Sequence, residues 1–147
     1  MNFETFLVNI PVKNLERSIQ FYSALGFSKH PVFQGPGASC LCISAHANLM
    51  LQTEEHFRKF TAHPIPDSSR TTGLLLCVHC DSPSQVNDLV KRALVAGGTT
   101  TDEAQDLGFL YTHGFVDPDG YVWKLNHIYP NRSIEHAPNR ASSDANE

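Results

Sequence analysis

The order of secondary-structure signals repeats once along the chain. Each half reads as a strand, a helix and three further strands. The first set is predicted at residues 6–12, 15–25, 27–33, 39–44 and 48–53. The second set is predicted at residues 73–80, 82–96, 99–103, 110–116 and 121–127. A repeat of about 65 residues indicates an internal duplication, and one copy alone is too small to bury the face of its sheet.

Residues at the helix ends support this assignment. Asn14 is an N-cap residue before the first helix, and Gly26 follows where that helix should end. Ser82 and Gln85 have the spacing of a capping box, with Pro83 at the first helical position. Both helices therefore begin and end at equivalent places in the two halves.

We predict an α+β fold in which two βαβββ modules form a curved mixed sheet around a shared cavity. The predicted modules span 5–62 and 72–130, joined by a polar linker at 63–71, and together form one domain, 1–130. A short helix is expected at 54–61, at the end of the first module. Residues 131–147 are polar without periodicity, and we expect a loose tail there.

Composition excludes several classes of protein. The formal net charge of -4 argues against nucleic acid as a partner, because phosphate binding needs a basic face. No apolar run approaches the ~20 residues that span a bilayer, and the start, MNFETFLVNIPV, lacks the features of a signal peptide. We therefore expect a cytosolic protein that does not act at a membrane.

The cysteines Cys40, Cys42, Cys77 and Cys80 are expected to be reduced and buried. Cys77 and Cys80 have CxxC spacing, but they fall in a predicted strand and would point to opposite faces of the sheet. Cys40 and Cys42 share a face, yet two ligands are too few for a structural zinc site.

Three stretches resemble the vicinal oxygen chelate superfamily: IPVKNLERSIQFYSALGF (10–27), CDSPSQVNDLVKRALVAGG (80–98) and FVDPDGYVWKL (115–125). This superfamily includes glyoxalase I, extradiol dioxygenases, and fosfomycin- and bleomycin-resistance proteins. The resemblance covers residues ~5 to ~130, and NLMLQTEEHFRKF (48–60) is similar to an uncharacterised subgroup. It implies the fold given above, a small organic molecule as partner and a homodimer.

The resemblance also implies where a divalent metal would bind. In its enzymes, four strand residues hold one metal ion that polarises two neighbouring oxygens of the substrate. The matching positions are Leu7, Met50, Leu75 and Lys124. Leucine has no donor atom, methionine is a weak and soft ligand, and a protonated lysine repels a cation. We therefore predict that the standard metal site is absent and that the chain has no cofactor.

Strand parity predicts which residues line the cavity. The expected set is Leu7, Asn9, Met50, Gln52, Leu75, Cys77, His79, Val122, Lys124 and Asn126. Lys124 has two interpretations: a lysine that extends to solvent, or a partner for a ligand's anionic or carbonyl group, including a catalytic lysine with a pKa lowered by desolvation. Asn9 and Gln52 are either satisfied polar groups or ligand contacts.

Three further side chains are candidates for chemistry. His79 could act as a general base, and Tyr111 could move a proton. His113 is a candidate ligand contact, although alternation from Gly114 turns Tyr111 and His113 away from the cavity. The remaining histidines that we interpret as surface residues are His30, His46, His56 and His63, while His127 is interpreted as structural.

Three functions remain open from the sequence. The first is a metal-independent lyase, isomerase or cyclase acting on a carbonyl- or enol-bearing molecule, with Lys124, His79 and Tyr111 as catalytic residues. The second is a non-catalytic small-molecule binding protein of the bleomycin-resistance type. The third is an enzyme with a relocated metal held by His79, His113 and a carboxylate.

Overall fold

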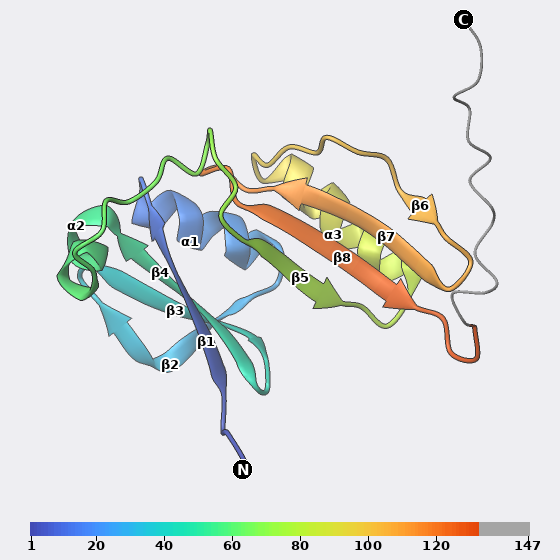
Figure 1. The fold of residues 1–147 in the computed structure, drawn as a ribbon, viewed down its shortest axis with the longest axis horizontal. Coiled ribbons are helices and arrows are strands. Elements are labelled where there is room, and N and C mark those ends of the chain that lie inside the picture. Colours follow the sequence, from blue (N-terminus) through green and yellow to red (C-terminus); the bar gives the residue numbers. More distant parts are fainter. Residues whose placement is uncertain (133–147) are drawn as a thin grey trace, which may run out of the picture.

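Two four-stranded sheets, one in each module, form the body of the molecule (Figure 1). The computed structural model describes residues 1–132, so the expected tail at 131–147 lies almost wholly outside the described residues. The first sheet contains β1 (Phe6–Val12), β2 (Ser28–Gly35), β3 (Ala38–Ser44) and β4 (Ala47–Thr53) in the order β1-β4-β3-β2. The second contains β5 (Leu75–His79), β6 (Gln105–Asp106), β7 (Leu110–Val116) and β8 (Val122–Ile128) in the equivalent order β5-β8-β7-β6.

Each sheet is mixed, as a duplicated βαβββ unit requires. The first strand of each module pairs in parallel with the last strand, β1 with β4 and β5 with β8, and the other neighbours are antiparallel. The two sheets stay separate and do not close on each other. The predicted α+β duplication is therefore confirmed.

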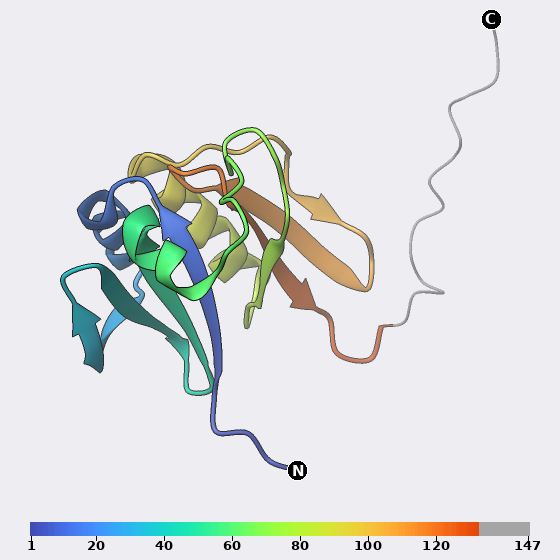
Figure 2. The same cartoon turned by 60° about the vertical axis from the view of Figure 1, so that its left-hand side comes forward.

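The helices cover one face of the sheets. Figures 1 and 2 show α1 (Leu15–Ala24) and α3 (Pro83–Val95) next to each other, each against the sheet of its own module. The side chain of Asn14 accepts a hydrogen bond from Arg17 N at 3.0 Å and caps α1. Ser82 caps α3 in the same way. After β4 the chain forms α2 (Glu54–Phe57) and the short 3₁₀ helix η1 (Arg58–Phe60).

Aromatic side chains from both modules share one core. Phe115 and Trp123 of the second module stack with their ring centroids 5.8 Å apart. Phe21 on α1 lies 5.9 Å from Phe115, and Tyr22 lies 5.7 Å from Trp123, measured between centroids. Trp123 Nε1 also donates a hydrogen bond to the Tyr22 hydroxyl at 3.0 Å. These rings therefore lie in a core to which both modules contribute.

The turn before β8 joins the modules through hydrogen bonds. The Asp119 carboxylate is buried and accepts from Lys13 N at 2.9 Å, from Arg17 Nη2 at 3.2 Å and from Ser18 Oγ at 3.1 Å. All three donors belong to the first module. Asp117 lies in the same turn, and its carboxylate accepts from the Tyr22 hydroxyl on α1. The turn thus fixes the start of α1 against the second sheet.

One predicted strand is wrong. The segment 99–103 forms a single bridge, from Thr99 to Val116, and the edge strand β6 lies further on, at 105–106. Side-chain bonds replace the ladder here, because Thr100 Oγ1 donates to Gly114 O at 2.8 Å and Thr101 Oγ1 to Asp102 Oδ1 at 2.5 Å. Threonine and aspartate favour such local bonds over regular structure.

The structure also tests the predicted burial of the cysteines and the expected lack of a membrane-spanning helix. All four cysteines are free; Cys40 and Cys80 are buried, as predicted. Cys77 is exposed, contrary to the prediction, because it lies on the face of β5 that no helix covers. In the part of the chain that the structure describes, no helix has the length and apolar character needed to cross a membrane.

Candidate functional site

The residues predicted to line a cavity lie on the faces of the two sheets that turn away from the helices. In the first sheet, Asn9 of β1 lies opposite Met50 of β4. In the second, Cys77 of β5 lies opposite Lys124 of β8, and Leu75 and His79 pair with Val122 and Asn126. The intervening residues, such as Ile10, Leu49, Trp123 and Leu125, are buried on the helix side. The structure therefore brings the predicted set to one side of the molecule, but spreads it over both sheets.

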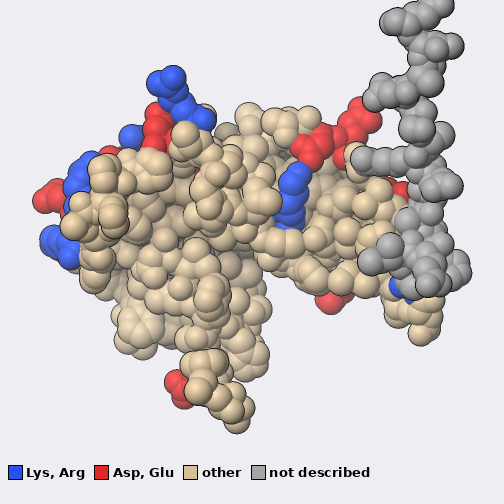
Figure 3. All heavy atoms as spheres, in the orientation of Figure 1, with Lys and Arg blue, Asp and Glu red and all other residues tan. Residues whose placement is uncertain are grey.

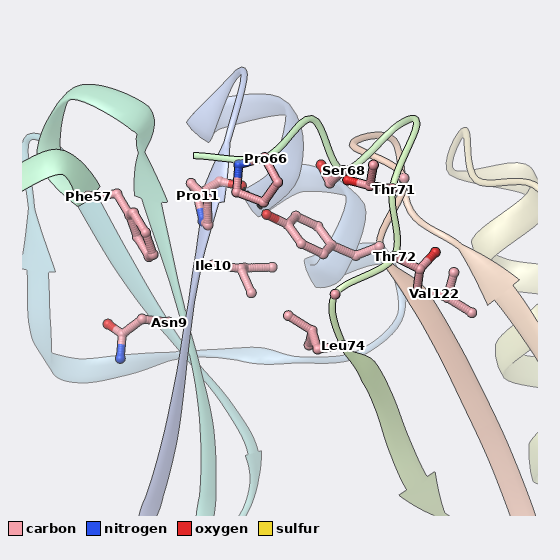
Figure 4. Close-up of a pocket in the computed structure, with 13 residues that line it drawn as sticks. Asn9, Ile10, Pro11, Phe57, Pro66, Ser68, Thr71, Thr72, Leu74 and Val122 are labelled. Atoms are coloured by element: carbon pink, nitrogen blue, oxygen red, sulfur yellow. Dashed lines mark hydrogen bonds between the residues drawn. The ribbon is translucent and has the colours of Figure 1, made fainter. Parts of the chain in front are cut away.

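Two adjoining cavities run along β1, and we call them together the groove. The first, of about 160 Å³, lies between β1, Phe57, the segment 66–74 and residues 120–122 (Figure 4). The second, of about 360 Å³, shares Asn9 and Phe57 with the first and is completed by Gln52, Phe60 and Thr61. The segment expected to be only a linker therefore forms one wall of the groove.

The side chains that line the groove are mainly apolar, and none of them is charged. In Figure 3 large parts of this face carry no charged side chain, although one basic side chain with acidic ones beside it lies near the middle of the view. Tyr121 closes part of the wall: its hydroxyl donates to Pro11 O at 2.7 Å, and burial raises its pKa to about 12. An apolar recess with few polar groups is typical of small-molecule sites.

The polar groups at the groove form a chain of three side chains. Gln52 Nε2 donates to Asn9 Oδ1 at 2.7 Å, and Gln52 Oε1 lies 2.8 Å from His56 Nδ1. Gln52 is only 4% exposed, so both ends of its amide depend on these partners. The sequence predicts a surface position for His56, but its side chain is half-buried and belongs to this chain of hydrogen bonds. Its position four residues after Gln52, at the start of a helix, was the signal that could have linked the two.

Lys124 does not extend into the groove. Its Nζ lies 2.6 Å from Asp102 Oδ2, and both side chains are about one-third exposed, at 34% and 39%. The lysine reaches Asp102 by crossing β7 at Gly114, where a Cβ would lie 3.2 Å from Lys124 Cδ. Hydrogen bonds from Lys124 and Thr101 lower the pKa of the Asp102 carboxyl. Sequence reasoning missed Asp102 because it falls in the wrongly assigned strand.

Tyr111 and His113 lie on the helix side of β7, away from the groove. The Tyr111 hydroxyl donates to Asn87 Oδ1 on α3 at 2.9 Å. His113 Nε2 lies 3.0 Å from Asp102 O, and its Nδ1 is buried without a hydrogen-bond partner among the described residues. His79 stays on the open face of β5, where it is exposed. These three side chains therefore do not meet at one site.

Comparison with known proteins shows where such a chain belongs. A sequence profile of the Glyoxalase/Bleomycin resistance protein/Dioxygenase superfamily matches residues 6–125. The chain is a member of this superfamily. The predicted resemblance is confirmed, since both names describe the same duplicated fold. No curated protein matches the chain.

Several solved structures are similar to this chain over most of their length. A hypothetical protein from S. aureus is 23% identical, with a TM-score of 0.73, covering 86% of this chain and 95% of that one. A glyoxalase-related enzyme from Fulvimarina pelagi is 21% identical, with a TM-score of 0.70, covering 90% and 96%. A glyoxalase/bleomycin resistance protein from Albidiferax ferrireducens T118 is 26% identical, with a TM-score of 0.61, covering 84% and 97%. These similarities support the fold, whereas the chemistry of the protein has to be argued from the residues of the site.

The superfamily's metal does not fit the residues at its usual positions. Leu7, Met50 and Leu75 offer no oxygen or nitrogen ligand, and the fourth position holds the Lys124 ammonium paired with Asp102. The relocated site predicted from His79 and His113 is not formed, because the two rings lie on opposite sides of the second sheet. Within residues 1–132, no three His, Cys, Asp or Glu side chains are grouped closely enough to hold a metal ion.

Proposed function

We propose that this superfamily member binds a small organic molecule in the groove along β1 without using a divalent metal at the superfamily's usual positions. The observation that carries the proposal is the uncharged, mainly apolar lining of the groove around the Asn9 and Gln52 amides. Apolar walls supply most of the affinity for a small ligand, and a few fixed polar groups orient it. The pairing of Lys124 with Asp102 supports the same view, since the lysine is not free to meet a ligand in the groove.

The proposal is tested by closing the groove. Leu74 lines it and is 40% exposed, whereas Leu94 lies outside it on α3 and is 44% exposed, so the two provide a matched pair. Aromatic and alicyclic compounds would be screened by ligand-observed NMR against protein dialysed with EDTA. Compounds that bind should lose binding to Leu74→Arg and keep it with Leu94→Arg. Equal binding to both variants would place the ligand elsewhere, and binding only after a metal is restored would contradict metal independence.

A metal-independent lyase, isomerase or cyclase is the second candidate. The observation that favours it is the Lys124–Asp102 pair, a close acid–base pair on the same sheet face as His79. Once a substrate is found, Lys124→Ala should lower its turnover at least about tenfold if the lysine takes part. Unchanged turnover in that variant would remove the proposed role. Tyr111, turned toward α3, is no longer part of this hypothesis.

A homodimer and a cytosolic location remain proposals from the sequence. The exposed apolar residues of the open faces, Leu7 at 37% and Leu75 at 60%, support pairing, because a second copy would cover them. Light scattering on the purified chain distinguishes the monomer mass of 16.3 kDa from twice that value.

A further inference from the structure

We propose that the groove ligand is a neutral molecule with an apolar body and a hydrogen-bond-accepting oxygen, such as a ketone carbonyl, that receives a hydrogen bond from the Asn9 side-chain NH₂. This inference rests on the proposed binding function and specifies the class of ligand. Its basis is the direction of the Asn9–Gln52–His56 chain together with the absence of charge in the groove lining.

The direction of the hydrogen-bond chain determines which end of the Asn9 amide faces the groove. Gln52 Nε2 donates to Asn9 Oδ1, so the carbonyl end of Asn9 is already engaged. Gln52 Oε1 can only accept, so the 2.8 Å contact with His56 Nδ1 is a hydrogen bond in the tautomer that carries its proton on that nitrogen. No partner for Asn9 Nδ2 occurs among residues 1–132. Asn9 lines both cavities, so this free donor is available to a ligand in either of them.

The lining argues that the ligand carries no charge. An ion that enters the groove loses hydration and finds amides and hydroxyls, but no side chain of opposite charge. Two basic side chains of the first module, Lys13 and Arg58, are paired with Glu54, at 3.0 Å and 3.4 Å from its carboxylate. A carbonyl oxygen needs a single donor, which the Asn9 amide supplies. A neutral acceptor therefore matches the site better than a carboxylate or an ammonium of the same shape.

The apolar walls define the rest of the ligand. Phe57 and Leu74 lie on opposite sides of β1 in Figure 4, and Phe60, 71% exposed, extends the wall of the second cavity. A flat hydrocarbon body against these side chains would leave its oxygen at Asn9, where the two cavities meet. We therefore expect planar, mostly apolar ketones to bind better than compact polar metabolites.

The test compares three naphthalene probes that differ only in the polar group: 2-acetonaphthone, 2-naphthoate and the 2-naphthylmethylammonium ion. Affinities would be measured by NMR titration of the full chain. The ketone should bind about tenfold more tightly than either ion, because it receives the hydrogen bond from Asn9 and does not pay the cost of removing a charge from water. Asn9→Ala should weaken ketone binding about fivefold to tenfold and leave binding of the naphthylmethylammonium ion, which cannot accept a hydrogen bond, nearly unchanged. Asn9→Asp, of the same shape, should instead favour the ammonium ion.

Gln52→Glu tests the positioning role of the second residue in the chain. A carboxylate cannot donate, so Asn9 would have to turn its NH₂ toward position 52 and present Oδ1 to the groove. The preference for the ketone over the ammonium ion should then reverse, although the Asn9 side chain is retained. Gln52→Met removes the partner without a charge and should only reduce the preference. A variant that merely disturbed the fold would weaken all three probes together.

The outcomes separate this inference from the proposed function. If the three probes bind with equal affinity and the Asn9 variants do not change the ranking, the groove binds ligands but the inference about their chemistry is overturned. If no probe binds to the wild-type chain, both proposals are overturned. If binding is absent from a dimer and appears only when the protein dissociates on dilution, a second copy occupies the groove, and both are again overturned.

Discussion

Replacing Asp117 by asparagine should change how the stability of the fold depends on pH. The Asp117 side chain lies in the turn that joins the modules, in a residue only 4% exposed. It accepts hydrogen bonds from the backbone N–H groups of Asp119 and Tyr121, each at 2.9 Å, and from the Tyr22 hydroxyl. Burial raises its pKa from 3.8 to about 6, because the loss of hydration outweighs the hydrogen bonds that favour the carboxylate.

The sign of the effect follows from which state holds the proton. Between pH 3.8 and about 6, folded Asp117 keeps a proton that the unfolded chain has released. The free energy of unfolding therefore falls as pH rises through this window, by about 3 kcal/mol in total at ~1.36 kcal/mol per pH unit. Asparagine does not titrate. The stability of the wild type relative to Asp117→Asn should thus fall by about 2 kcal/mol between pH 4.5 and 7.5.

Urea unfolding at a series of pH values measures this difference. Trp123, the single tryptophan of the chain, is 1% exposed and reports the loss of the shared core by fluorescence. Asp67→Asn is the control: Asp67 is exposed, and hydrogen bonds from Ser69 lower its pKa, so its contribution is lost as pH falls and has the opposite sign. A difference between wild type and Asp117→Asn that stays constant, or that grows as pH rises, would refute the reasoning.

Two further predictions concern the second sheet. Gly114→Ala should destabilise the protein by about 2 kcal/mol or more, because its Cβ would lie 2.4 Å from Trp123 O and push β7 from β8. The control in thermal melts is Gly73→Ala, whose added Cβ has no atom within 4 Å, and equal losses of stability in the two variants would contradict the steric argument. Lys124→Met and Asp102→Asn should each change the free energy of unfolding by less than about 1 kcal/mol, because the pair is partly exposed, and a larger loss in urea titrations would show that the pair supports the fold.

Much of the fold could be predicted because the residues that fix it are local signals. Asn14 and Ser82 cap their helices as expected, and alternation along residues 121–127 correctly placed Trp123 on the buried face. The segment 99–103 failed for a physical reason. Its threonines have high strand propensity, but their hydroxyls bond to nearby backbone and side-chain oxygens and stop a regular ladder from forming.

The site was less predictable because it depends on contacts between distant segments. Parity placed Asn9 and Gln52 on the open face, and the structure joins them directly. Parity says nothing about where a long side chain ends, and so Lys124 was expected at the cavity although it crosses Gly114 to reach Asp102. The groove wall at residues 66–72 lies before the predicted strand and has no periodic pattern, and its place against β1 comes from tertiary packing.

The residues of the turn before β8, which help to identify the superfamily, stabilise the contact between the two modules, and this role needs no metal. Asp119 ties the turn to Lys13 N and Ser18 Oγ of the first module, and Asp117 bonds to Tyr22 inside the shared core. Replacing either would leave donors of the other module unpaired in the interior, which is costly whatever the chemistry at the site. The open-face positions are under no such constraint: Leu75 is 60% exposed, and Lys124 makes a partly exposed ion pair. A duplicated chain can therefore keep the turn and the packing of its modules while the metal ligands are replaced, and in this fold the motif indicates architecture rather than reaction.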